Sequence, residues 1–363
     1  MNDTIKLQVI KAKQPIGVFY IAKIPSLELL KMSAVDRRYI NEDAEVLGVQ
    51  RPLRKDKIQE IKRYLTTPNA TFPNSIIVNV KRENVINEND QELELKRQDD
   101  TFTIIDGQHR LFGFEDYSGG AFELILTVFI GLETDLQAEV FSIINSQQTK
   151  VDPSLNINLE LADKSLNPRK VLVQIAQSFN YDKESPLHNS IKMLGGQSEG
   201  LISLSAFVKP LFNLTYPERQ IYTIKNMLLK AYPNFPDFSV LDVDDRRYPF
   251  WRFYINQDIG VIYKILLNYF NAFKAVLEND WLNPDSLLNK TTGYNAMIKL
   301  FGDIILVGIQ QKRLSESFFV ETLAPIAEMT GTVVADNYGS SGLYYSNNLY
   351  KDMYKRLELP VVR

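Results

Sequence analysis

The chain of 363 residues contains no cysteine and only two histidines. The lack of cysteine excludes disulfides, thiolate chemistry and zinc sites built on cysteine. Two histidines cannot form a three-histidine metal site, and a catalytic triad would have to use His109 or His188. No run of about 18 apolar residues is present, so a membrane-spanning helix is not expected.

The chain also has no excess of positive charge, since 41 Lys and Arg face 44 Asp and Glu and give a net charge of −3. This balance argues mildly against a protein that binds DNA mainly through the phosphate backbone, although it leaves a local basic patch open. The first residues do not lead from a basic segment into an apolar one, so no secretory signal is expected. Together these features favour a cytoplasmic protein with no membrane partner.

The hydrophobic pattern divides the chain into two parts. Segments with the alternation or β-branched content typical of strands are 5–10, 18–22, 75–80, 101–105 and 122–131. Helical segments are expected at 27–32 (with Ser26 as its cap), 55–65, 109–115, 135–144, 259–277 and 293–309. We therefore expect an α/β (α+β) domain over residues 1–160, with a mixed sheet and helices. A mostly helical domain over 161–363 follows, and a shared core is left open.

The most informative segment is the pentapeptide from Asp106 to Arg110, Asp-Gly-Gln-His-Arg, which joins a strand to a helix. Gly107 permits a positive φ or a close approach to a ligand. The first N–H groups of the following helix favour an anion, and Arg110 can donate two hydrogen bonds to a phosphate. Asp106 is a candidate helix cap, partner of His109 or magnesium contact. A purely structural turn, with Asp106 as cap and Arg110 in an ion pair, remains the alternative.

Three other polar segments have ordinary interpretations on their own. The basic stretch at 51–63 is typical of a solvated helix face balanced by Asp56 and Glu60, although Arg51 precedes the helix and is the better site candidate. Residues 290–293, Lys-Thr-Thr-Gly, favour a threonine cap over an anion site, because the glycine spacing of a Walker A loop is missing. Asn145 to Lys150 by itself is typical of a polar helix end.

Residues 105–111, IDGQHRL, resemble the signature of the DGQHR-domain family, which is similar to the ParB/sulfiredoxin-type nucleotide-binding fold. In that fold a related strand–turn–helix holds a phosphate. Residues 141–151, FSIINSQQTKV, resemble the second element of the family, and residues 50–52, 72–75 and 290–293 are also similar. In length and layout the chain most resembles the DndB group, which is associated with bacterial DNA phosphorothioation.

The resemblance implies a composite site for ATP or another nucleotide, with magnesium, and leaves hydrolysis open. It assigns catalytic roles to Asp106, Gln108 and His109. It assigns nucleotide or phosphate contacts to Arg51, Gly107, Arg110, Asn145, Gln148, Thr149 and Lys150. The alternative that it implies is a non-catalytic, DNA-binding transcriptional regulator, with basic residues of the carboxy-terminal helices on DNA. Expected partners are a nucleotide, DNA, other DNA-modification proteins and a second copy of the chain. A nuclease is less favoured, because no cluster of acidic residues and histidines is evident.

Overall fold

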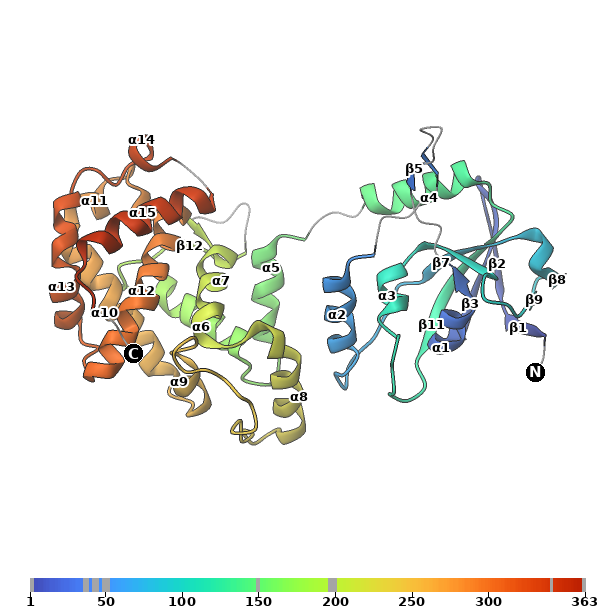
Figure 1. Ribbon diagram of the computed structural model, residues 1–363, viewed down its shortest axis with the longest axis horizontal. Helices are drawn as coiled ribbons and strands as arrows, with labels where there is room; N and C mark the ends of the chain where they lie inside the picture. Colours follow the sequence, from blue (N-terminus) through green and yellow to red (C-terminus); the bar gives the residue numbers. More distant parts are fainter. Residues whose placement is uncertain are drawn as a thin grey trace. The chain divides into compact units, whose positions relative to one another are not determined.

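The computed structural model describes residues 3–34, 39–40, 46–47, 53–147, 151–194, 201–339 and 342–360. Arg51, Gln148, Thr149 and Lys150 lie outside the described residues. The chain folds as two compact units, Met1–Lys150 (unit 1) and Val151–Arg363 (unit 2) (Figure 1). We expected the division near residue 160; in the structure it falls after Lys150, so α5 (Pro153–Asn158) belongs to unit 2.

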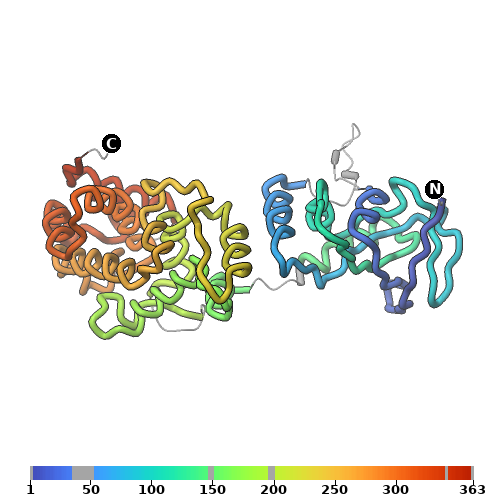
Figure 2. The backbone as a smooth tube through the Cα atoms, turned by 90° about the horizontal axis from the view of Figure 1, so that it is seen from below, coloured from blue at the N-terminus to red at the C-terminus, as the bar shows by residue number. Residues whose placement is uncertain are grey.

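Unit 1 is built on a six-stranded mixed sheet with the order β2-β3-β11-β7-β10-β4 and a three-stranded sheet with the order β1-β9-β8. The strands of both sheets are β1 (Thr4–Gln8), β2 (Ile10–Gln14), β3 (Gly17–Pro25), β4 (Ser33–Ala34), β7 (Ile76–Val80), β8 (Val85–Glu88), β9 (Glu92–Lys96), β10 (Phe102–Asp106) and β11 (Glu123–Ile130). A short pair, β5 (Tyr39–Ile40) and β6 (Val46–Leu47), is antiparallel. In Figure 2 the blue β1 runs beside the cyan β8–β9 hairpin, its antiparallel neighbour through β9.

The central strands of the large sheet are parallel to each other, because β11 runs alongside β7 in the same direction. On the far side of β7, β10 runs antiparallel and places Asp106 opposite Ile77. The alternation of apolar residues buries Ile76, Val78 and Val128 completely. The carboxyl end of β10 therefore lies at the beginning of β7, and this arrangement positions the pentapeptide.

The described residues of unit 1 form four α-helices: α1 (Ser26–Lys31), α2 (Lys55–Tyr64), α3 (Gln108–Phe112) and α4 (Thr134–Gln147). In Figure 1, α2 and α3 lie side by side. Two expectations about this unit are wrong in detail. The strand at 5–10 is divided into β1 and β2, because residues up to Gln8 pair with β9 and residues from Ile10 onward pair with β3. Between them, the N–H of Val9 donates to the carbonyl of Gln91 (2.9 Å). Ser26 is the first helical residue, and Pro25 holds the cap position.

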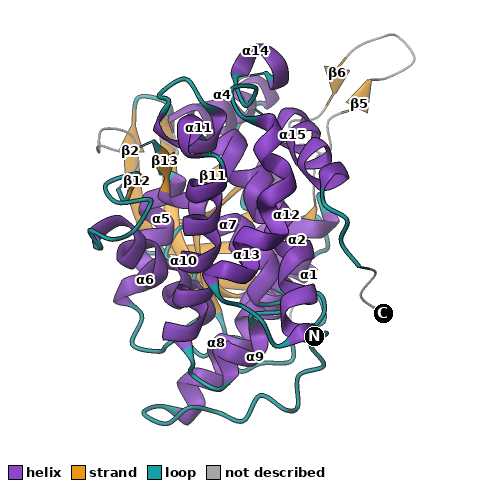
Figure 3. Ribbon diagram, turned by 90° about the vertical axis from the view of Figure 1, so that its left-hand side faces the viewer, coloured by secondary structure: helices purple, strands orange, loops and turns teal. Residues whose placement is uncertain are grey.

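Unit 2 is helical, as expected. Its helices are α5, α6 (Pro168–Tyr181), α7 (Leu204–Thr215), α8 (Ile221–Ala231), α9 (Trp251–Ile255), α10 (Ile259–Val276), α11 (Glu278–Leu282), α12 (Thr291–Gln311), α13 (Glu316–Leu323), α14 (Ala335–Tyr338) and α15 (Leu343–Arg356). Figure 3 shows these helices in purple, with the short strands β12 (Ile191–Lys192) and β13 (Ile202–Ser203) beside them. The fold class is therefore mixed α/β followed by a helical region.

The buried apolar residues of the described chain form two clusters, one in each unit. The cluster of unit 2 surrounds α12. Within the described chain this is the one helix whose length and hydropathy would suffice to cross a membrane, and 67% of its most apolar window is buried inside the protein. Burial in the core of unit 2 accounts for that composition.

Candidate functional site

The pentapeptide forms a tight strand–turn–helix. Strand β10 ends at Asp106, Gly107 adopts a left-handed conformation (φ +95°, ψ 12°), and α3 begins at Gln108. A Cβ on Gly107 would lie 2.5 Å from Cδ1 of the buried Ile76 and 3.1 Å from Nη2 of Arg110. Residues other than glycine rarely adopt this backbone conformation, so both the angle and the space require glycine here.

Arg110 is bound within the protein by three oxygen atoms. Its Nη2 donates to Oδ2 of Asp106 (2.9 Å) and to the carbonyl of Ser75 (3.2 Å), and its Nη1 donates to the carbonyl of Asn74 (2.8 Å). The side chains of Arg110 and Asp106 are only 21% and 26% exposed, so this ion pair is largely shielded from solvent. Arg110 therefore fastens the turn to the segment that leads into β7. Because Asp106 accepts this bond and Gly107 holds the cap position, Asp106 does not cap α3.

His109 connects the turn to α2. Its Nε2 accepts a hydrogen bond from the backbone N–H of Arg54 (3.0 Å), the residue at the cap position of α2. An accepting Nε2 places the ring proton on Nδ1. Burial lowers the pKa of His109 below its ordinary value of 6.5, and the positive charges of Arg54 and Lys57 lower it further, against the opposing effects of Asp56 and Asp106. His109 is therefore a neutral imidazole at the amino end of a ten-residue helix.

Three of the cations on and next to α2 are paired with carboxylates, as expected for a solvated helix face. The Nε of Arg54 donates to Asp56 (3.2 Å) and the Nζ of Lys57 donates to Glu60 (2.8 Å). At the other end of the helix, Lys62 reaches Glu115 (3.3 Å) and Asp116 (3.1 Å) near the end of α3. The exposed pairs at the amino end are weak, so Arg54 and Lys57 can exchange these partners for another anion.

The remaining predicted residues are only partly brought together. Gln108 is buried at the start of α3, 5% exposed. Asn145 lies on α4, exposed, where its Nδ2 donates to the carbonyl of Phe141 (2.8 Å) in the previous turn of the same helix. The described contacts of Asn145 are thus local to α4. Since Arg51 and residues 148–150 lie outside the described residues, the composite site remains a prediction.

No group of three or more His, Asp or Glu side chains able to hold a metal ion occurs in the part of the chain that the structure describes. Asp106, the candidate magnesium contact, is bound to Arg110. Magnesium often binds through one or two carboxylates together with substrate phosphates. A single Asp106 carboxylate fits that mode once it is released from Arg110, so the magnesium contact also remains a prediction.

At the opposite end of β7, the structure has a polar cavity of about 440 Å³ that the sequence did not suggest. Asn79 clamps the loop after β11, because its amide donates to the carbonyl of Leu132 (3.2 Å) and accepts from the Leu132 N–H (3.0 Å). Gln137 donates to the same carbonyl (2.7 Å). Lys81 and Arg82 line the cavity. A polar side chain inside an otherwise apolar strand, as at Asn79, was the available signal.

Residues 290–293 serve packing rather than capping. Lys290 holds the cap position of α12 without a side-chain hydrogen bond, so the expected threonine cap is wrong. A Cβ on Gly293 would lie 2.0 Å from the carbonyl oxygen of Leu287, in the short 3-10 helix Leu287–Asn289. Glycine is therefore required where α12 crosses this segment.

The comparisons with known proteins give one family. The family model described as DndB, DNA-sulfur modification-associated, matches residues 7–225, which is more than half of the chain. The match contains the large sheet of unit 1, the turn at Asp106–Arg110 and unit 2 as far as α8. No curated protein and no solved structure shows a significant match.

Proposed function

The chain belongs to the DndB, DNA-sulfur modification-associated, family and is thus a protein of a DNA phosphorothioation system; from this premise we propose that unit 1 binds the phosphate of a nucleotide. The proposed site lies where the turn at Gly107–Arg110 meets the amino end of α2. This proposal keeps the location expected from the pentapeptide and changes the groups that carry the binding.

The hydrogen bond from Arg54 to His109 is the observation that carries the proposal. It holds the amino end of α2 against the turn, where the helix dipole favours an anion. Arg54 and Lys57 add positive charge, and both are exposed. Burial is the main cause of the lowered pKa of His109, and the positive charges of Arg54 and Lys57 lower this pKa further. A phosphate at this point would displace Asp56 and Glu60 from weak surface pairs.

Hydrolysis of the nucleotide is a further property that the proposal leaves to measurement. The predicted catalytic residues are Asp106, Gln108 and His109. When magnesium and a nucleotide bind, the metal supplies charge neutralisation between the phosphates. For Asp106 to contribute to that, its carboxylate must exchange Arg110 for the metal. Arg110 would then be free to donate to a phosphate, as the resemblance implies. The ParB/sulfiredoxin likeness of the fold belongs to the same proposal.

Binding of ATP, GTP and CTP, with and without magnesium, tests the proposal by calorimetry. The double variant Arg54→Gln/Lys57→Gln is expected to raise the Kd at least tenfold, since it removes two charges from exposed positions. Lys62→Gln is the matched control, because Lys62 lies on the same helix but pairs with Glu115 and Asp116 at its other end. Absence of binding to wild type with magnesium, or equal loss in both variants, would contradict the proposed site.

Phosphate release by wild type, Asp106→Asn and Arg110→Ala then separates binding from turnover. Turnover that is lost in Asp106→Asn while binding is kept supports a catalytic role for Asp106. Binding that is unchanged in Arg110→Ala, with unit 1 still folded, assigns Arg110 to the structure of the turn.

A DNA-binding regulator without catalysis is the second candidate, favoured by the DNA-modification link of the family and by exposed cations along α2, including Lys55 and Arg63. Retention of duplex DNA that weakens steeply with salt would support it, because phosphate contacts release counterions. Lack of retention at low salt would refute it. The two functions are compatible, since a nucleotide could change the affinity for DNA. Other modification proteins and a second copy of the chain remain expected partners, and a cytoplasmic location remains expected.

A further inference from the structure

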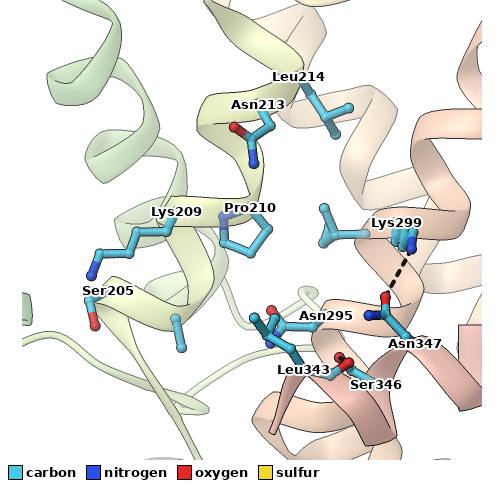
Figure 4. A pocket seen from close by; sticks show the side chains of 12 residues that line it. Ser205, Lys209, Pro210, Asn213, Leu214, Asn295, Lys299, Leu343, Ser346 and Asn347 are labelled. Carbon is cyan, nitrogen blue, oxygen red and sulfur yellow. Dashed lines mark hydrogen bonds between the residues drawn. The ribbon is translucent and has the colours of Figure 1, made fainter. Parts of the chain in front are cut away.

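Unit 2 contains a cavity of about 650 Å³ between three helices, α7, α12 and α15. Figure 4 shows Lys209, Pro210 and Asn213 on the α7 wall, with Asn295 and Lys299 on α12. The volume is in the range of small-molecule sites, about 300–1,000 Å³. All of the lining residues belong to unit 2, so the cavity is independent of the site proposed in unit 1.

The lining of the cavity has two parts with different chemistry. Ala206, Pro210, Leu214, Ile298 and Leu343 provide an apolar surface. Around it stand the amides of Asn213, Asn295 and Asn347. An apolar surface with a few placed polar groups is typical of a site for a small organic ligand.

The charge of the lining has one sign. Lys209 and Lys299 are both among the twelve lining residues, and none of the twelve carries a carboxylate. Lys299 is fixed, because its Nζ donates to Oδ1 of Asn347 (2.8 Å) and lies 4.3 Å from the centre of the Tyr350 ring. Lys209 is exposed, and in the described part of the chain neither it nor the Asn213 and Asn295 side chains make a hydrogen bond or ion pair. The charged groups of the lining therefore favour an anion over a cation.

We propose that this cavity binds a nucleoside phosphate, with the base on the apolar surface, the Asn213 and Asn295 amides at the edge of the base, and the phosphate at Lys209. Amides both donate and accept hydrogen bonds, which suits the mixed edge of a base better than the acceptor-only carboxylate of an aliphatic acid. The shared chemistry has two sources, a free nucleotide and a nucleotide of a single strand.

An exposed aromatic residue next in sequence to a lining residue distinguishes the two sources. Tyr344 follows the lining residue Leu343 at the start of α15 and is 71% exposed. A neighbouring base of a single strand can stack on such a ring, whereas a mononucleotide in the cavity has no second base. Tyr344→Ala is therefore expected to weaken binding of a short oligonucleotide and to leave binding of a mononucleotide unchanged.

The test is a calorimetric titration of the full chain with dAMP, dCMP, dGMP, TMP and a short single-stranded oligonucleotide. Inorganic phosphate and decanoate serve as probes for an anion without a base and an apolar anion. Lys209→Glu is expected to raise the Kd at least tenfold, and Asn295→Leu to reduce the discrimination among bases. Lys264→Glu, an exposed lysine on α10, is the matched control for the charge change.

The Arg54→Gln/Lys57→Gln variant separates this site from that in unit 1. Binding that is lost in Lys209→Glu and kept in that double variant assigns the ligand to unit 2. The proposal is overturned if no nucleotide binds at millimolar concentration, if inorganic phosphate or decanoate binds as tightly as the nucleotides, or if Lys209→Glu and Lys264→Glu behave alike. Fluorescence of Trp251 and Trp281, both in unit 2, verifies that unit 2 is folded in each variant.

Discussion

Replacing Gly107 with alanine should destabilise unit 1 through two separable effects. The left-handed backbone conformation, with φ +95°, costs a residue with a Cβ about 1–2 kcal/mol. The new Cβ would also lie 2.5 Å from Cδ1 of Ile76, which is fully buried. Overpacking of this kind costs about 1–3 kcal/mol. The free energy of unfolding of unit 1 should therefore fall by about 2–5 kcal/mol.

A second substitution isolates the steric part, because Ile76→Val removes the Cδ1 atom that the new Cβ would strike. On its own Ile76→Val costs about 0.5–1.5 kcal/mol. In the double variant the contact is relieved while the backbone cost stays. The double variant should be at least about 1 kcal/mol more stable than the sum of the two single changes predicts.

Hydrogen exchange of the slow amides in β7, β10 and β11 measures the stability of unit 1. A loss of 2 kcal/mol accelerates their exchange about 30-fold, since 1.4 kcal/mol is a factor of ten. Both tryptophans lie in unit 2, so their fluorescence follows the other unit in the same sample. Gly120→Ala is the control, because a Cβ there meets nothing within 4 Å. Wild-type exchange in Gly107→Ala, or strict additivity in the double variant, would refute the reasoning.

Three further results are expected. The pKa of His109 is lowered in the folded unit, so the unfolded state binds the proton at a higher pH than the folded state does. Unit 1 should therefore lose stability as the pH falls below about 6.5, and His109→Gln should remove this part of the pH dependence of the urea midpoint. Arg110→Met should destabilise unit 1 by about 2–3 kcal/mol in urea unfolding, because it strips a shielded ion pair and two carbonyls of their donor, and Arg110→Lys should recover only part of this loss. Arg169→Met should destabilise unit 2 by about 2–3 kcal/mol, because Arg169 donates to Glu218 and to the buried hydroxyl of Tyr216 (3.1 Å). Urea unfolding followed by tryptophan fluorescence measures this loss, and an unchanged unfolding midpoint would contradict the account.

The elements of the fold could largely be predicted from local pattern. The β-branched runs that become β7, β10 and β11 and the amphipathic repeats that become α10 and α12 carry their structure in neighbouring residues. The predicted boundaries of helices and strands were wrong where a contact with a distant part of the chain determines them. α3 is shorter than the expected helix at 109–115, and Gly113 there packs so closely on α2 that a Cβ would lie 2.2 Å from Cγ2 of Ile61.

The pentapeptide predicts where the candidate site lies, but it does not predict the hydrogen-bond partners of the site residues. Two of the three oxygen atoms that bind Arg110 belong to Asn74 and Ser75, more than 30 residues earlier. The partner of His109 is the backbone N–H of Arg54, at the cap position of α2. The cavity of unit 2 is lined by residues of three helices, which bring Lys209 and Asn347 to the same site. Nothing in local spacing encodes such meetings, because they follow from the packing of whole elements.

The position of β11 in the large sheet has a consequence for the order of folding during synthesis. This strand, residues 123–130, is the last of unit 1 to leave the ribosome, yet it lies between β3 and β7. Until it arrives, the β2–β3 hairpin and the β7–β10 pair have no strand to join them into one sheet. During this period more than a hundred residues have left the ribosome, and two sheet edges of the nascent chain are unpaired. Binding by a chaperone would protect these edges from pairing with other chains.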